Sequence, residues 1–296
     1  MKRTVAAWLA CLVLASMTVL TLCACASGQS QTPVDDSPQL IDAKVVDKVR
    51  SNILGVSFDS YWVETSYEYD EDGKLTGTSQ SSNYAQSNIN KAKSIFEYDD
   101  AGRLVKVSRA FEQDQWNVGN AETFTYNDQG LCTDYSYEIV SQGNGGIAFS
   151  YSYDGGRIAS AVVANRVGQG TKTFDVSWSY LNDGRISKAV SGIGGEAGFG
   201  LVDELSDPDQ GVYAYRDVYD GITTLKYNED GSLASSSTRS KNSNEASQEV
   251  YEYKTITVDP SKYVPNVYSN PTGFDARWKP QVTLAEVPQS PSDQDS

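Results

Sequence analysis

One short phrase recurs six times along this chain and constrains its fold more than any other feature. Each copy has two aromatic or apolar residues flanking a polar one, a turn rich in Asp or Asn, a Gly, and then Leu, Ile or Cys two residues later. Such tandem copying indicates one supersecondary unit repeated along the chain. The copies are residues 67–69 before Gly73, 96–98 before Gly102, 124–126 before Gly130, 151–153 before Gly156, 178–180 before Gly184 and 225–227 before Gly231.

The phrase predicts a β-hairpin whose register can be counted. Side chains two residues apart on a strand share a face, so Tyr67 and Tyr69 lie together and Glu68 lies opposite. The loop that follows suits a three-residue turn with Gly73 in the left-handed conformation, which only Gly enters without a Cβ penalty. The fourth copy is one residue shorter and fits a two-residue loop of the primed type. The predicted pairs are Tyr69 with Leu75, Tyr98 with Leu104, Tyr126 with Cys132, Tyr153 with Ile158, Tyr180 with Ile186, and Tyr227 with Leu233.

These hairpins predict an all-β fold. Half units at 46–50 and 251–253 flank the copies, giving a single antiparallel meander of about 12–14 strands. A sheet this wide must twist, so we expect a strongly curved sheet or a wide soluble barrel. The outward positions are polar in every unit, which excludes a barrel whose exterior meets lipid. They are Glu68, Glu97, Thr125, Ser152, Ser179, Lys226 and Glu252.

The N-terminus has the pattern of a secretory leader, because Lys2 and Arg3 precede an apolar run at 5–22 that is short for a membrane span. The run ends in Leu-Cys-Ala-Cys at 22–25, which resembles the bacterial lipoprotein signal. The resemblance implies cleavage after Ala24, acylation of Cys25, and no transmembrane helix after processing. Cleavage before Cys23 is disfavoured, since it needs a small residue where Leu22 stands, and an uncleaved apolar anchor is the other alternative.

Charge and local composition indicate the partners, the location and the segments of the chain. The chain has 24 basic and 39 acidic residues, and losing Lys2 and Arg3 makes its net charge of −15 more negative. Such a surface repels nucleic acid and anionic headgroups, so we expect no nucleic-acid partner and a tethered protein on the extracytoplasmic face of a bacterial membrane. The expected segments are a signal peptide at 1–24, a lipidated flexible tether at 25–43, the repeat domain at 44–258 with an insertion at 191–211, a covering segment at 259–285 and a disordered tail at 286–296.

Two phrases carry a family resemblance. Tyr-Asp-Asp-Ala-Gly-Arg-Leu at 98–104 and Tyr-Asp-Gly-Gly-Arg-Ile at 153–158 resemble the YD repeat of the RHS family of bacterial surface and toxin proteins. The resemblance covers 67–253 with one interruption and implies hairpins here, although six units are too few for the toxin-enclosing shell of that family. The chain is also similar to small bacterial lipoproteins built of YD-like repeats, which implies the fold rather than an activity.

Several kinds of chemistry are excluded or disfavoured. The chain has no His, which removes Ser–His and Cys–His catalysis and the commonest zinc ligand. Cys132 occupies the position after the turn that Leu or Ile occupies in the other copies, and it is expected to be a buried apolar residue. Turn acids are expected because Asp and Asn build turns. The acids at 203–209 lack the bidentate Glu of an EF-hand and predict a solvated loop, and 192–200 is expected to be flexible. We expect no catalytic residue, metal or cofactor.

The aromatic face is the candidate ligand site, because Tyr and Trp faces stack on sugars and anchor protein partners. Core packing is the alternative, since Tyr is a strong β-former. If the aromatic face excluded water, however, every buried Tyr hydroxyl would need a hydrogen-bond partner, and each hydroxyl left without one would cost about 1–3 kcal/mol. The candidate residues are Tyr67, Tyr69, Tyr98, Tyr126, Tyr151, Tyr153, Trp178 and Tyr180.

Two functional hypotheses follow. The first is a non-enzymatic, membrane-anchored surface lipoprotein whose Tyr-rich sheet binds a glycan, a peptide or an envelope protein, or which forms part of the envelope. The alternative is a carboxylate-dependent glycan hydrolase of the cell surface, with acids from the insertion and the sheet. That mechanism needs two carboxyl groups about 5–9.5 Å apart across a cleft.

The lipidation hypothesis is tested by metabolic labelling with a fatty acid. Cys25→Ala should lose the label, because the Cys25 thiol is the predicted acyl acceptor. Cys23→Ala is the matched control and should keep it. Label that persists in Cys25→Ala would contradict the assignment.

Overall fold

The structure is a computed structural model that describes residues 39–52, 62–83, 91–111, 115, 117–140, 145–167, 170–191, 198–243 and 246–289. The chain divides into two compact units, residues 1–37 and 38–296, and every described residue belongs to the second. The predicted leader and Cys25 therefore lie outside the described residues. Among the residues that are described, no helix is long and apolar enough to cross a membrane.

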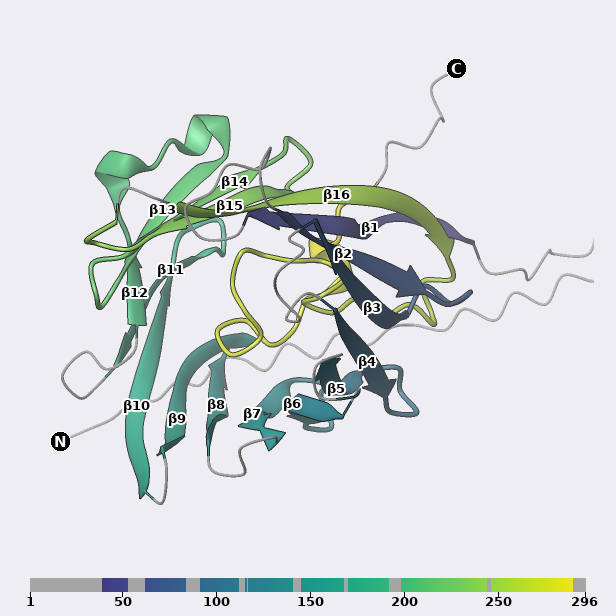
Figure 1. The fold of residues 1–296 in the computed structure, drawn as a ribbon, viewed down its shortest axis with the longest axis horizontal. Helices are drawn as coiled ribbons and strands as arrows, with labels where there is room; N and C mark the ends of the chain where they lie inside the picture. Colours follow the sequence, from purple (N-terminus) through teal and green to yellow (C-terminus); the bar gives the residue numbers. More distant parts are fainter. Residues whose placement is uncertain are drawn as a thin grey trace, which may run out of the picture. The chain divides into compact units, whose positions relative to one another are not determined.

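Antiparallel strands β1–β16 form one closed barrel in which every strand pairs with its sequence neighbours and β16 pairs with β1 (Figure 1). The predicted all-β meander is thus confirmed as a closed barrel. The strands are β1 Ile41–Asn52, β2 Trp62–Tyr69, β3 Leu75–Ser82, β4 Ala92–Tyr98, β5 Leu104–Phe111, β6 Val118–Tyr126, β7 Cys132–Ile139, β8 Gly145–Asp154, β9 Arg157–Val167, β10 Gly170–Tyr180, β11 Ile186–Ser191, β12 Gly198–Leu201, β13 Val212–Asp217, β14 Ile222–Tyr227, β15 Leu233–Arg239 and β16 Ala246–Val258.

The strand number exceeds the predicted 12–14 because the insertion contributes a hairpin of its own, β12–β13. Its connection carries two short 3₁₀ helices, η4 Asp203–Leu205 and η5 Pro208–Gln210. The expected flexibility of 192–200 is wrong for residues 198–200, since they pair with residues 188–190 in the ladder, and residues 192–197 lie outside the described part. Ladder hydrogen bonds come from the backbone, so a Gly-rich run can join a sheet without side chains to pack.

The counted register is confirmed in all six copies, from Tyr69 opposite Leu75 to Tyr227 opposite Leu233. A register shift of one residue immediately precedes each pair and accommodates the turn. In the fourth copy, Gly155 and Gly156 have φ of 56° and 81°, as the primed two-residue loop requires. The turn acids are structural: Asp99 Oδ1 accepts the N–H groups of Ala101 at 3.0 Å and Arg103 at 2.8 Å.

The Tyr before most turns donates its hydroxyl to a backbone carbonyl of the preceding unit, a contact that we call a tyrosine clamp. Within the described residues, the clamps join Tyr69 to Val46, Tyr98 to Leu75, Tyr126 to Leu104, Tyr153 to Cys132, Tyr180 to Ile158, Tyr215 to Ile186 and Tyr253 to Leu233, at 2.6–3.0 Å. Tyr227 departs from the pattern and donates to Thr272 at 2.7 Å, because the inserted hairpin supplies Tyr215 to Ile186.

The clamps exist because neighbouring hairpins separate before they reach their turns. The ladder between β5 and β6 has its last pair at Lys106 and Thr123, two residues short of Leu104. The Leu104 carbonyl would lack a ladder partner there, and the Tyr126 hydroxyl satisfies it. A Phe could fill the same space but could not make this bond. The repeated choice of Tyr therefore has a structural cause.

Basic side chains that follow the turn Gly add a second contact between units. Arg103 lies over the Tyr126 ring at 4.9 Å and Arg157 over the Tyr180 ring at 5.5 Å. Cation–π contacts of this kind contribute about 0.5–1 kcal/mol at exposed sites. The Tyr-Asp-x-x-Gly-Arg phrase thus encodes a clamp, a turn cap and a stacking cation.

Residues 259–289, which we call the inner segment, lie in the middle of the ring of strands (yellow in Figure 1). The N–H of Val46 donates to the Ser269 carbonyl at 3.0 Å, and that of Lys44 donates to Pro288 at 3.0 Å. Residues 286–289 of the predicted disordered tail are therefore ordered, because β1 supplies backbone partners for them. Residues 290–296 lie outside the described part.

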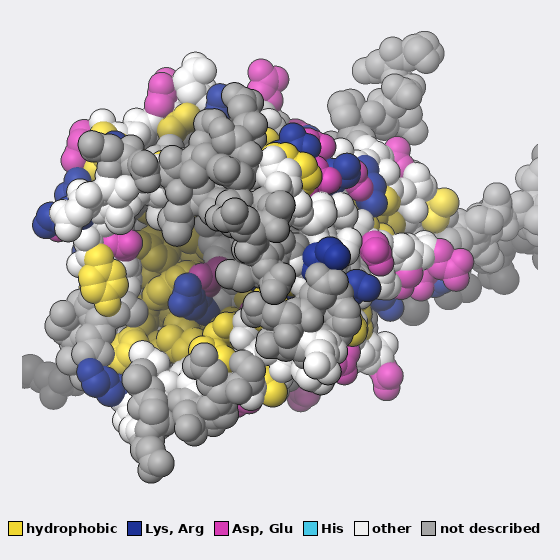
Figure 2. Space-filling view, viewed as in Figure 1, with side chains coloured by type: hydrophobic (Ala, Val, Ile, Leu, Met, Phe, Trp, Pro, Cys, Tyr) yellow, Lys and Arg dark blue, Asp and Glu magenta, His cyan; other side chains and the backbone are white. Residues whose placement is uncertain are grey.

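The repeats place polar residues on the outer face of the barrel. The seven outward positions predicted from the repeats are all exposed in the structure. Arg50 pairs with Glu64 at 2.9 Å and Lys106 pairs with Glu97 at 2.7 Å. Figure 2 shows acidic and basic side chains interspersed along the outer edge. This face is suited to water.

The clamps predict that Tyr126→Phe lowers the free energy of unfolding by about 1–3 kcal/mol, because it leaves a carbonyl without its partner. Tyr219→Phe is the control, since Tyr219 is 76% exposed, and it should change stability by less than about 0.5 kcal/mol. Urea denaturation followed by Trp fluorescence measures both. Equal stability of the two variants would contradict a structural role for the clamp.

The turn geometry predicts that Gly102→Val costs at least about 1 kcal/mol, because Gly102 has φ of 77° and a β-branched residue is strained there. An added Cβ would also lie 3.2 Å from Val264 Cγ2. Ala101→Val, in the exposed part of the same turn, is the control. A Gly102→Val melting temperature equal to wild type would refute the turn assignment.

Candidate functional site

Among the cavities that the described residues line, two lie between the inner segment and the strands. The turn-end cavity has a volume of about 530 Å³ and is bordered by the β8–β9, β10–β11 and β14–β15 turns. The inner chamber has a volume of about 240 Å³ and is bordered by β2–β7 and Tyr268. No residue lines both cavities. The interior therefore offers two separate sites to ligands.

The turn-end cavity combines aromatic walls with charged side chains. Its aromatic lining residues are Tyr153, Tyr180, Tyr227, Tyr253, Phe274 and Trp278. Both lining carboxylates are neutralised: Asp183 pairs with Arg185 at 3.0 Å, and Glu286 pairs with Lys279 at 2.6 Å. Burial favours a higher pKa for Glu286, but Lys279 and the Thr283 N–H outweigh it and lower that pKa.

Arg157 is the lining cation that these pairs leave over. Among the described residues it makes no ion pair, and its contact is the Tyr180 ring at 5.5 Å. Its guanidinium also lies against the β10–β11 turn, where a Cβ added to Gly184 would be 3.2 Å from an Arg157 nitrogen. The absence of a side chain at Gly184 therefore leaves room for the guanidinium. Arg157 therefore contributes to the cavity lining a guanidinium whose positive charge is not neutralised by a described carboxylate.

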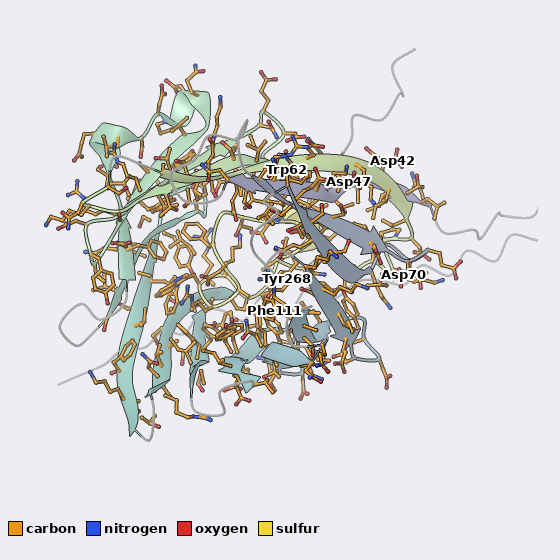
Figure 3. The ribbon with its side chains drawn as sticks, in the orientation of Figure 1. Asp42, Asp47, Trp62, Asp70, Phe111 and Tyr268 are labelled. Carbon is orange, nitrogen blue, oxygen red and sulfur yellow. The ribbon has the colours of Figure 1, made fainter. Side chains whose placement is uncertain are left out.

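The inner chamber contains a half-buried carboxylate, Glu122. Its Oε2 accepts hydroxyl hydrogen bonds from Tyr135 at 2.8 Å and Tyr268 at 2.6 Å. Tyr268 belongs to the inner segment and lies inside the ring of strands in Figure 3. Burial raises the pKa of Glu122, and the two hydroxyls oppose that shift without cancelling it. Desolvation disfavours the charged form of a carboxyl group in this way.

The structure distributes the predicted ligand-binding residues over several environments. Tyr153 and Tyr180 line the turn-end cavity, and Tyr67 lines the inner chamber. Tyr69, Tyr98 and Tyr126 are clamps that line neither cavity.

Tyr151 and Trp178 are 7% exposed and belong to an aromatic cluster with Trp278, which lies 5.9 Å from Trp178 between ring centroids. Tyr151 also donates its hydroxyl to the Arg277 carbonyl at 2.7 Å. In Figure 2 a hollow floored by hydrophobic side chains lies between the β10–β11 side of the barrel and the inner segment.

The predicted site residues did not include Arg157, Glu122 or Arg109, the last of which also lines the inner chamber. The signal for Glu122 was parity, since it lies two residues before Phe124 and therefore faces inward. The signal for Arg157 was its place directly after a turn Gly in the repeated phrase. In the sequence, Glu122 and Arg157 could not be distinguished from the many charged residues expected at the surface.

The other predicted chemistry behaves as scaffold. Cys132 is fully buried, burial raises the pKa of its thiol to about 12, and its Sγ donates to the Asp134 carbonyl at 3.4 Å. The insertion acids Asp203, Glu204 and Asp209 are exposed on η4 and η5. Within the described ranges, no group of three or more Cys, Asp or Glu side chains is placed to hold a metal ion.

Comparison with known proteins finds no matching family model and no matching curated protein. Among solved structures, the chain is similar to a porin-like protein from Bacteroides uniformis at 16% identity and TM-score 0.40, covering 71% of this chain and 96% of that one. It is also similar to a chain of the TcdB2-TccC3-Cdc42 structure at 11% identity and TM-score 0.31. That match covers 70% of this chain and 13% of the other. These similarities assign neither a fold nor an activity to the chain.

The raised pKa of Glu122 predicts a pH-dependent contribution to stability. Between the ordinary value of 4.5 and the raised value, the folded state binds more protons than the unfolded state, so rising pH destabilises the fold. Glu122→Gln removes this component, and its unfolding free energy relative to wild type should improve as pH rises through that window. Urea denaturation of both proteins at several pH values measures it. Parallel pH profiles would contradict the shift.

Proposed function

We propose that this protein is a lipid-anchored surface binding protein whose turn-end cavity holds a carboxylate-bearing glycan. The observation that carries the proposal is Arg157, a cation without a carboxylate partner among the described residues, facing a cavity of about 530 Å³. Ligand cavities of about 300–1,000 Å³ with aromatic walls and a few placed polar groups are typical of small-molecule sites.

The cavity chemistry supports a glycan with an acidic group. Phe274 and Trp278 offer aromatic surface on which the C–H faces of sugar rings stack. Arg157 offers planar N–H donors that match a carboxylate in bidentate geometry. An acidic ligand would supply the negatively charged partner that Arg157 lacks among the described residues, whereas a neutral ligand would leave the guanidinium without an ion pair.

The proposal places the barrel outside the cell. Cleavage of the leader and acylation of Cys25 would attach the chain to the extracytoplasmic face of a bacterial membrane, with residues between Cys25 and β1 as the tether. Acyl chains contribute about 0.8 kcal/mol per buried methylene, so two or three acyl chains suffice for a stable anchor. The likeness of the repeats to those of YD-like lipoproteins supports this assignment.

A non-enzymatic role fits the acids of this cavity better than hydrolysis does. Asp183 and Glu286 are both held in ion pairs, and the pKa of Glu286 is lowered, whereas a general acid needs a raised one. The insertion acids that the hydrolase hypothesis requires are exposed on η4 and η5 and line neither cavity. Hydrolysis therefore remains the weaker alternative.

The proposal is tested with an array of acidic and neutral glycans, using the full chain carrying Cys25→Ala. Binding should favour carboxylate-bearing glycans, and Arg157→Ala should weaken it at least about ten-fold, the effect of losing one charge-assisted hydrogen bond. Arg166→Ala is the control, because Arg166 lies on the same strand but does not line the turn-end cavity. Silence of the whole array, or equal binding by the two variants, would refute the assignment.

A further inference from the structure

We propose that the inner chamber is a second ligand site, which binds one neutral sugar ring between Arg109 and Glu122. The chamber has a volume of about 240 Å³ and shares no lining residue with the turn-end cavity. The proposal therefore does not depend on what the turn-end cavity binds. It rests on how two opposite charges, those of Arg109 and Glu122, line the same cavity.

Arg109 and Glu122 lie on the neighbouring strands β5 and β6. The register pairs Arg109 with Asn120 and Val107 with Glu122, so the two charged residues are diagonal neighbours on the inner face. Diagonal neighbours lie about 7–8 Å apart, within reach of long side chains. Both residues line the chamber, yet these two described side chains form no ion pair with each other. Opposite charges that could meet are kept apart.

Each charge is held in place by other partners. The Glu122 Oε2 accepts the Tyr135 and Tyr268 hydroxyls, and no hydrogen bond is made to its Oε1 within the described residues. Arg109 donates to Gln80 Oε1 at 2.9 Å, and Gln80 in turn donates to Thr65 Oγ1 at 3.1 Å. The carboxylate and the guanidinium are thus oriented before a ligand arrives, which reduces the entropic cost of binding.

The chamber chemistry fits a polyol. A hydroxyl group both donates and accepts, so adjacent sugar hydroxyls can donate to Glu122 Oε1 and accept from the Arg109 guanidinium. The Arg109 and Glu122 charges cancel, so a charged ligand would bring an uncompensated charge into a partly buried space. Neutral hydrogen-bonding side chains complete the lining: Thr65, Thr78, Gln80, Ser94 and Asn120.

The chamber walls suit the other face of a sugar. Phe96 and Tyr268 meet edge to face at 5.4 Å between ring centroids, and both line the chamber together with Tyr67 and Tyr137. Aromatic surface packs against the C–H side of a pyranose ring. The volume of about 240 Å³ lies below the roughly 300–1,000 Å³ typical of small-molecule pockets, so the chamber suits a single ring better than a chain.

The test uses the full chain carrying Cys25→Ala, with glucose, galactose, mannose and N-acetylglucosamine as probes in saturation-transfer NMR and calorimetry. At least one sugar should bind. Glu122→Gln should weaken it about ten-fold or more, because the charged acceptor is lost while the side-chain shape is kept. Ser94→Leu should abolish it by filling the chamber. Thermal melts of each variant establish that it is folded.

Two controls locate the site. Glu138→Gln, on the outer face where Glu138 is 53% exposed, should leave sugar binding unchanged. Arg157→Ala reports separately whether a sugar occupies the turn-end cavity instead. Silence of all the sugars would overturn the proposal. Binding that survives both Glu122→Gln and Ser94→Leu would overturn it as well, as would binding that is lost only in Arg157→Ala.

Discussion

The tyrosine clamp is the contact on which the rest of the structure depends. A hairpin closes its own hydrogen bonds, but a barrel also needs neighbouring hairpins to stay joined where their turns diverge. The clamp joins them there, as when Tyr98 donates to Leu75 at 2.8 Å. The series reaches the β1–β16 junction from both sides, because Tyr69 on β2 reaches Val46 on β1 and Tyr253 on β16 reaches Leu233 on β15. Closure itself comes from the backbone ladder between β1 and β16.

The clamps explain how the inner face can contain many buried tyrosines although each hydroxyl needs a hydrogen-bond partner. A row of buried tyrosines would be costly if their hydroxyls lacked partners, at about 1–3 kcal/mol each. Backbone carbonyls of the adjoining unit satisfy most of this row, and the inner segment satisfies others, such as Tyr227 through Thr272. Ligands are therefore not required to explain the tyrosines. Binding is better sought among polar groups that have no such partner, such as Arg157 and Glu122 Oε1.

The sequence predicted the hairpins well because their determinants are local. Parity, turn length and Gly positions gave the register of every unit, including Tyr153 opposite Ile158 across the shorter loop. Closure into a barrel and the path of the inner segment depend on contacts between distant residues, such as Val46 with Ser269. The β12–β13 hairpin escaped prediction because Gly198 and Gly200 carry no side-chain pattern, and their pairing comes from the backbone.

The candidate sites were harder to predict because they arise where the repeat departs from itself. In the second copy, Asp99 stands four residues before Arg103 and pairs with it at 2.7 Å. In the fifth, Asp183 pairs with Arg185 at 3.0 Å. The fourth copy has lost a turn residue.

Its Asp154 lies directly opposite Arg157 in the ladder, and these two described side chains form no ion pair. In this shorter turn Arg157 lines a cavity without a carboxylate partner among the described residues, while Tyr153 and the hairpin stay in register. The shorter turn is thus compatible both with the hairpin register and with the charge that we propose for ligand binding.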